Sequence, residues 1–198
     1  MQVTEDLQRR LRVAARAIGR NGLAHAYGHC SVRLDDKNFL VCAARPMGLI
    51  KPGEAGIVVP INGPLPEGVL GEVRLHQQIY RRRLEIGSVV RSMPPAVMIL
   101  GTACRVPKAR HGMGAYFGDG PALWSDPQLV RDDQLASAVI ETMGQKNAVV
   151  MRGNGLVVAA SSLEKVVSLT PLNFCDENLL YNHTFSLRFL PKFQTLEF

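Results

Sequence analysis

The sequence predicts an α/β fold, and three observations lead to this prediction. Apolar side chains recur at helical spacing within residues 5–20. Short runs rich in β-branched residues follow, and turn residues such as Gly, Pro, Asn and Asp separate them. Residues 71–100 combine both patterns, because a helical stretch that ends near Gly87 leads directly into a short β-prone run.

The predicted elements follow one another along the chain. Asn21-Gly22 ends the first helix in the manner of a left-handed cap, and residues 35–38 form a hairpin turn between the first two strands. Helices are predicted over residues 5–20, about 71–86, 132–143 and from Leu163 onward. Strands are predicted over residues 30–34, 39–42, 56–61, 88–90, 148–151 and 156–159.

Three stretches fit this pattern less simply. The apolar run over residues 96–101 is predicted to continue the core. Residues 105–126 form a long irregular stretch that includes His111, and such a loop in a compact domain is usually functional or mobile. Pro171 is predicted to interrupt the last helix.

Length and composition indicate one globular domain over residues 1–198, with no membrane segment. The N-terminal stretch carries Glu5 and Asp6 and lacks the apolar core of a secretion signal. The cysteines show neither CxxC spacing nor the density of a disulfide framework, so we expect a cytoplasmic location. The net charge of +6 favours anions, but the basic residues are scattered and we expect no nucleic-acid partner.

An acid, a histidine and an arginine gather near the end of the central strand. Glu72 and His76 lie one helical turn apart on one helix face. Arg91 follows the β-prone run, which Pro94 ends because proline cannot donate to a ladder. α/β folds commonly place sites at strand ends. Glu72, His76 and Arg91 are therefore the candidate catalytic residues.

The order of these motifs resembles the class II aldolase/adducin superfamily. In that family an acid-x-x-x-His helix leads into a strand that ends in His-x-His-Pro, and a later Arg-Gly-His-Gly supplies a third histidine. The three histidines hold a divalent metal ion. The same positions here read Arg91-Ser92-Met93-Pro94 and Arg152-Gly153-Asn154-Gly155, so the frame is kept and the histidines are replaced.

The resemblance covers residues 5–169 and implies a fold and an assembly. It implies a three-layer α/β/α sandwich with a central, mostly antiparallel sheet, and a divergent tail from about residue 170. It also implies a homotetramer with sites between neighbouring subunits.

The replaced residues predict a degenerate metal site and no cofactor. In the family the metal acts as a Lewis acid that holds an oxyanion. Arg91 has no lone pair to donate, Met93 offers a soft thioether, and Asn154 offers one weak carbonyl oxygen. We therefore expect no divalent ion to bind.

Arg91 has two interpretations at this stage. Its guanidinium can bind a carboxylate or enolate in place of the metal, or it can form a purely structural ion pair with Glu72. Glu72 matches the family's proton-shuttling acid, and burial would raise its pKa whereas Arg91 would lower it. His76 is either a general acid or base or a helix-packing residue.

The remaining site candidates come from the same resemblance. His29 stands where the family has an asparagine, and Leu70-Gly71 replaces serines that bind phosphate. A histidine at this position also resembles the branch of the family that decarboxylates hydroxylated aromatic acids. We therefore predict a small anionic, possibly aromatic substrate, with His29, His111, Asn154 and Tyr27 in contact with it.

Two functions remain open. The first is a metal-independent lyase that performs decarboxylation, aldol or retro-aldol chemistry, or cyclisation. The survival of Glu72, His76 and His29 favours it. The alternative is a catalytically inactive adducin-like scaffold or small-molecule-binding protein, which the complete loss of the metal histidines favours.

Overall fold

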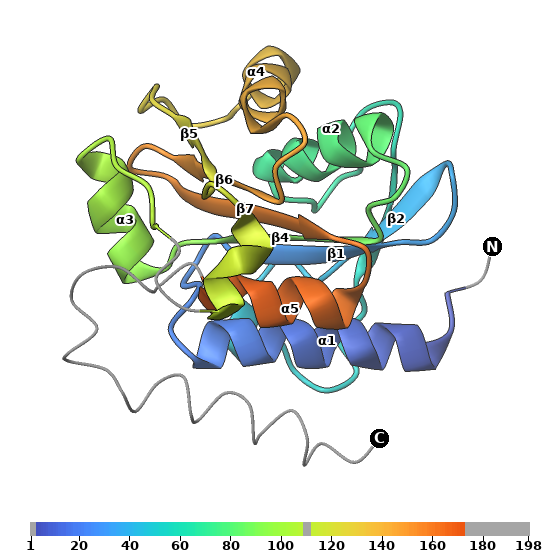
Figure 1. Cartoon of the computed structure of the whole chain (residues 1–198). Coiled ribbons are helices and arrows are strands. Elements are labelled where there is room, and N and C mark those ends of the chain that lie inside the picture. The colour runs from blue at the N-terminus through green and yellow to red at the C-terminus, as the bar shows by residue number, and fades with distance from the viewer. Residues whose placement is uncertain (1–2, 109–111, 173–198) are drawn as a thin grey trace.

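A central mixed sheet organises the molecule (Figure 1). A computed structural model describes residues 3–108 and 112–172 of the chain. The seven strands lie in the order β3-β2-β1-β4-β7-β6-β5, and every neighbouring pair is antiparallel except β5 and β6. The strands are β1 His29–Arg33, β2 Asn38–Val41, β3 Ile57–Pro60, β4 Ser88–Ser92, β5 Ala122–Trp124, β6 Ala148–Met151 and β7 Gly155–Ala160.

Helices cover both faces of the sheet, so the predicted three-layer α/β/α sandwich is confirmed. Helices α1 and α5 lie together on one face, and α2 and α4 lie together on the other (Figure 1). The helices are α1 Glu5–Arg20, α2 Arg74–Arg82, α3 Pro95–Thr102, α4 Asp133–Met143 and α5 Leu163–Leu172. Within the described residues no helix is long and apolar enough to cross a membrane.

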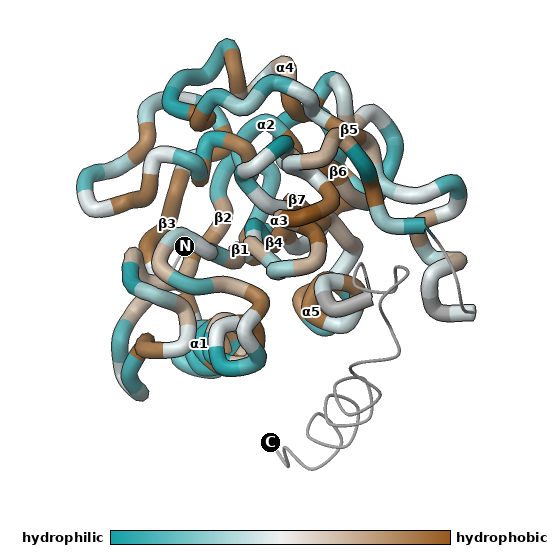
Figure 2. Tube along the Cα trace, turned by 90° about the vertical axis from the view of Figure 1, so that its left-hand side faces the viewer, coloured by the Kyte–Doolittle hydropathy of each residue, from teal (hydrophilic) through white to brown (hydrophobic). Residues whose placement is uncertain are grey.

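Alternation along the strands divides the core into two clusters. Cys30, Val90 and Val158 pack toward α1 and α5, whereas Val89 and Val157 pack toward α2 and α4. Strands β6 and β7 are apolar throughout, whereas β1 and β4 carry polar residues among the apolar ones (Figure 2). Because of this alternation, the side chains of residues 29, 31 and 91 all lie on the side of the sheet that faces α2. The candidate site is therefore on that side.

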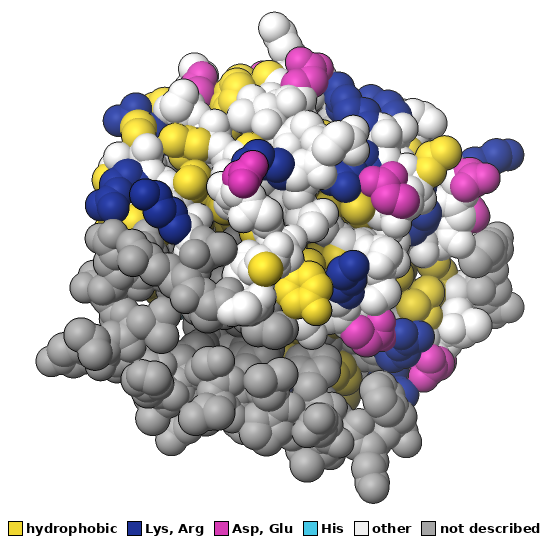
Figure 3. Space-filling view, in the orientation of Figure 1, with side chains coloured by type: hydrophobic (Ala, Val, Ile, Leu, Met, Phe, Trp, Pro, Cys, Tyr) yellow, Lys and Arg dark blue, Asp and Glu magenta, His cyan; other side chains and the backbone are white. Residues whose placement is uncertain are grey.

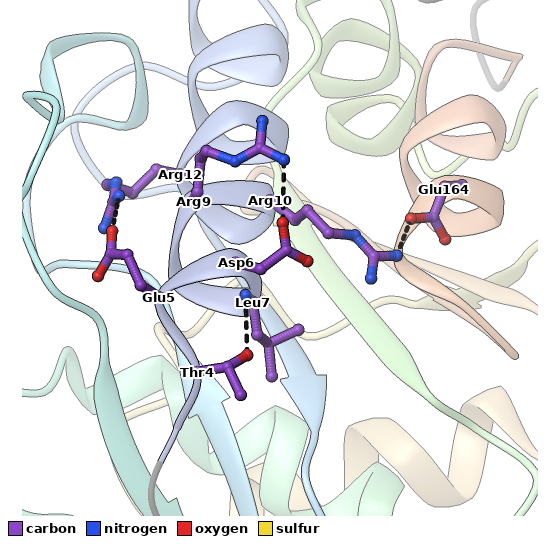
Figure 4. Close-up of polar contacts among 8 residues, drawn as sticks. All are labelled: Thr4, Glu5, Asp6, Leu7, Arg9, Arg10, Arg12 and Glu164. Atoms are coloured by element: carbon purple, nitrogen blue, oxygen red, sulfur yellow. Dashed lines mark hydrogen bonds and ion pairs between the residues drawn. The ribbon is translucent and has the colours of Figure 1, made fainter. Parts of the chain in front are cut away.

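An N-terminal cap and ion pairs stabilise helix α1 (Figure 4). The hydroxyl of Thr4 accepts a hydrogen bond from the Leu7 amide at 3.3 Å. Arg9 pairs with Asp6 at 2.9 Å within the helix, and Arg10 of α1 pairs with Glu164 of α5. On one face of the molecule basic, acidic and hydrophobic side chains are interspersed (Figure 3).

Two sequence predictions need correction. The apolar run over residues 96–101 is not continuous core but most of helix α3, which starts with Pro95 in its first turn and leaves Ile99 71% exposed. The stretch 105–126 is not wholly irregular, since it contains a six-residue 3₁₀ segment at Gly112–Phe117 and the strand β5. The predicted interruption at Pro171 falls where the described residues end.

Candidate active site

The site lies on the α2 side of the sheet, where β1, β4 and the turn before β7 meet. His29 of β1 is the direct cross-strand partner of Arg91 on β4. Gly155 has φ +87°, and a Cβ there would lie 2.2 Å from the carbonyl oxygen of Ser92. A glycine is therefore required for the turn to approach β4, and this approach brings Asn154 against Arg91.

The guanidinium of Arg91 is the centre of the site, and the residue is only 1% exposed. Its Nη2 donates to Oε2 of Glu72 at 2.9 Å and to Oδ1 of Asn154 at 2.6 Å. Its Nη1 donates to the carbonyl oxygen of Tyr27 at 3.2 Å. Nδ2 of Asn154 donates in turn to Oε1 of Glu72 at 3.0 Å, which closes a three-membered network. Among the residues that the structure describes, Nε of this guanidinium finds no partner.

A second network of four buried side chains adjoins the first. Nδ1 of His29 lies 2.9 Å from Nε2 of His76. Nδ1 of His76 lies 2.6 Å from the hydroxyl of Ser31, which lies 2.8 Å from the hydroxyl of Tyr80. His29 has one ring nitrogen left over, and its buried Nε2 has no partner.

Burial keeps both histidines neutral. Desolvation, and then the charge of Arg91, lowers the pKa of His76 to about 3. Desolvation, followed by His76 and Arg91, lowers the pKa of His29 well below its usual value. Burial also lowers the pKa of Arg91, and Glu72 opposes that shift. The guanidinium keeps its proton, so the site holds one fixed cation, a carboxyl group and two neutral imidazoles.

His29 forms part of the lining of a narrow hollow beside the 3₁₀ turn Gly71–Val73 that precedes α2. The other walls are mostly apolar and include Val41, Ile57, Leu70 and Val73. The hollow is too narrow for a water molecule as it stands, so a ligand enters it only when the walls move apart.

The side chains that the sequence resemblance assigns to the metal positions do not fit a divalent ion. The guanidinium of Arg91 already donates to Glu72 and Asn154, and its charge would repel a dication. Within the described residues no group of three or more His, Cys, Asp and Glu side chains is placed to hold a metal.

The structure brings most of the sequence candidates together. Glu72, Arg91 and Asn154 contact one another, and His29 contacts His76. Tyr27 contributes its backbone carbonyl, while the residue is 65% exposed. His111 lies outside the described residues.

Sequence reasoning missed Ser31 and Tyr80. Two spacings would have found them. Ser31 is two residues from His29, which places both on one face of a strand. Tyr80 is four residues from His76, which places both on one face of α2.

Comparison with known proteins gives the following relatives. Residues 9–171 match the model of the class II aldolase and adducin N-terminal domain. A 3,4-dihydroxyphthalate decarboxylase of Arthrobacter keyseri is 32% identical over 177 residues, which span 78% of this chain and 69% of that protein. A decarboxylase of the same name from a Terrabacter species is 30% identical over 176 residues, with 78% and 71% covered.

Solved structures support the fold. The L-fuculose-1-phosphate aldolase of Thermus thermophilus superposes with a TM-score of 0.78 at 21% identity, covering 93% of this chain and 97% of that one. The Escherichia coli protein YgbL, described as a putative aldolase, epimerase or decarboxylase, gives 0.71 at 19% identity, covering 93% and 89%.

Proposed function

Since this chain belongs to the class II aldolase and adducin family, we propose that it is a carbon–carbon lyase that decarboxylates a small hydroxylated aromatic acid without a metal ion. One observation carries the proposal: Nη2 of Arg91 contacts both Glu72 and Asn154. By the sequence resemblance, Asn154 corresponds to a metal-binding position of the family. The guanidinium of Arg91, which contacts Asn154, would therefore put a positive charge close to where the family holds its metal ion.

The chemistry needs a cation and a proton. In decarboxylation of an aromatic acid, a proton adds to the ring carbon that bears the carboxylate. The carbon–carbon bond then breaks, its electron pair restores the ring, and CO₂ leaves. Negative charge on the substrate oxygens must be held throughout, and a preorganised cation in a buried site does this effectively. Arg91 supplies that charge without titrating.

The other residues take complementary parts. Glu72 holds and delivers the proton, because its side chain is 18% exposed and so borders both solvent and the guanidinium. His29 orients the substrate through its unpartnered nitrogen. His76 acts through His29, since both of its ring nitrogens are already bonded. Asn154 holds Arg91 in place, and Tyr27 does so through its carbonyl.

The substrate class rests on the relatives and on the apolar hollow. Both curated relatives are named 3,4-dihydroxyphthalate decarboxylase. Once the narrow hollow opens, the apolar side chains of Leu70 and Val73 would pack against an aromatic ring better than against a sugar phosphate. His111 is proposed as a further substrate contact.

The same oxyanion chemistry also serves aldol, retro-aldol or cyclisation reactions. A homotetramer with sites between subunits is proposed from the family's assembly.

A second candidate, the inactive scaffold or small-molecule-binding protein, is favoured by a specific contact. The ion pair between Arg91 and Glu72 at 2.9 Å satisfies both charges without any ligand. A retired site would be expected to close in this manner, because an unpaired buried guanidinium is costly.

Ligand-dependent thermal unfolding with CO₂ detection separates the two candidates. We expect 3,4-dihydroxyphthalate to raise the unfolding midpoint and to release CO₂, and L-fuculose 1-phosphate to do neither. A matched control is Arg9→Met, which breaks an exposed ion pair and should leave both responses unchanged. If no hydroxylated aromatic acid stabilises the protein or loses CO₂, the lyase proposal is wrong and the scaffold is favoured.

A further inference from the structure

The four-residue network ends in the hydroxyl of Tyr80, which is fully buried and lies 2.8 Å from the hydroxyl of Ser31. A neutral phenol always carries a hydrogen to donate. Either direction of the network leaves one hydrogen without an acceptor: on Tyr80 it would be enclosed in the core, whereas on His29 it lies at the lining of the hollow, where a ligand can accept it. Tyr80 is for that reason the donor in this pair.

This direction propagates along the network. Ser31 accepts from Tyr80, so its own hydrogen is free to donate to Nδ1 of His76 at 2.6 Å. His76 then carries its hydrogen on Nε2 and donates to Nδ1 of His29 at 2.9 Å. His29, a neutral imidazole whose Nδ1 accepts, must carry its hydrogen on Nε2. That nitrogen is the buried atom without a partner.

A second unpartnered donor lies on the neighbouring strand. Among the described residues, the buried Nε of Arg91 has no hydrogen-bond partner, and Arg91 is the cross-strand partner of His29. Both side chains belong to the α2 side of the sheet. Two neighbouring strands therefore each carry one buried N–H group without an acceptor, one of them on a cation, and such donors suit an anionic oxygen.

We propose that Ser31 and Tyr80 are positioning residues that, through His76, hold His29 as the Nε2–H tautomer, so that His29 and Arg91 together bind the anionic group of an aromatic acid. This inference rests on the proposed function for the identity of the ligand. The network does not conduct protons to the site, because Tyr80 is buried and burial raises the pKa of its hydroxyl well above the usual value. Instead, the network orients the Nε2–H donor of His29 and excludes the Nδ1–H tautomer of that ring.

Nitrogen NMR of the protein labelled with ¹⁵N-histidine tests the tautomer directly. The signal of His29 is assigned by its loss in His29→Gln. We expect Nε2 of His29 to be protonated and Nδ1 to be bare in the wild type. Tyr80→Phe removes one oxygen atom and Ser31→Ala removes one hydroxyl, and either change should produce a mixture of tautomers. Ser31→Thr keeps the hydroxyl and should keep the single tautomer.

Binding of 3,4-dihydroxyphthalate supplies the second measurement. Tyr80→Phe should weaken its binding about tenfold, the usual effect of one misplaced hydrogen bond, at an almost unchanged unfolding midpoint. A wild-type His29 protonated on Nδ1, or a tautomer unaffected by both Tyr80→Phe and Ser31→Ala, overturns the positioning role whatever the protein catalyses. If His29 is the Nε2–H tautomer but the protein binds no aromatic acid, His29 and Arg91 do not bind such an anion. The proposed function is then wrong as well.

Discussion

Replacing Arg91 by methionine should destabilise the fold strongly, because the change leaves a carboxylate without its cation. Arg91 is 1% exposed and Glu72 is 18% exposed, so the pair is largely shielded from water. Breaking a buried ion pair by removing one partner costs about 3–5 kcal/mol. Water reaches Glu72 in part, so we expect the lower end, about 3 kcal/mol. In a chain of this length that corresponds to a midpoint lowered by about 6–12 °C.

Two further variants separate the ion pair from other effects of the substitution. Arg91→Met combined with Glu72→Gln removes both charges and keeps an acceptor for Nδ2 of Asn154, which donates to Oε1 of Glu72 at 3.0 Å. This double variant should recover about 2 kcal/mol of the loss. Arg9→Met is the surface control, since it breaks the exposed pair with Asp6 (Figure 4) and should cost less than about 1 kcal/mol.

Urea unfolding followed by circular dichroism measures all four proteins on one scale. The reasoning is refuted if Arg91→Met costs no more than Arg9→Met. It is also refuted if the double variant is no more stable than Arg91→Met alone, because the stranded carboxylate would then contribute nothing.

Three other predictions concern metal content, assembly and pH. Elemental analysis after gel filtration should find no stoichiometric zinc, manganese or iron, since the buried guanidinium of Arg91 would repel a dication, and near one ion per chain would contradict this. Light scattering should give a multiple of the 21.7 kDa chain mass, as a tetramer, and a monomer mass would reject it. Stability should fall as pH drops from about 6.5 toward 3, because the pKa of His76 is lowered to about 3 and the unfolded state alone binds that proton in this window. His76→Gln should reduce that dependence and leave the part due to His29, whose pKa burial also lowers, and an equal slope in both proteins would show that His76 is not responsible.

Much of the fold was predictable because it depends on local patterns. Helix α1 has a clear apolar face and an N-cap at Thr4, and α4 has Asp132, the predicted first residue, as its N-cap and ends before Gly144 as predicted. Helix α3 was missed, because a short run that is apolar throughout has no periodicity to distinguish helix from buried strand. Strand β5 was missed because its three residues owe their conformation to parallel pairing with β6.

The candidate site was predictable as a set of residues but not as a set of contacts. The helical spacing of Glu72 and His76 and the position of Arg91 after a strand were visible in the sequence. The pairing of His29 with Arg91 depends on the register between β1 and β4, which no local pattern specifies. For the same reason, sequence alone left open whether Arg91 meets Glu72, and the structure gives a contact of 2.9 Å.

The central claim, that Arg91 serves in place of a metal cation, is tested most directly by turnover of metal-free protein. The chain is treated with a chelating resin, and CO₂ release from hydroxylated aromatic acids is measured before and after manganese or zinc is added. The account predicts release from the stripped protein, no gain on adding either metal, and no release from the Arg91→Met, Glu72→Gln variant. Activity that is absent after chelation and restored by a metal would contradict it.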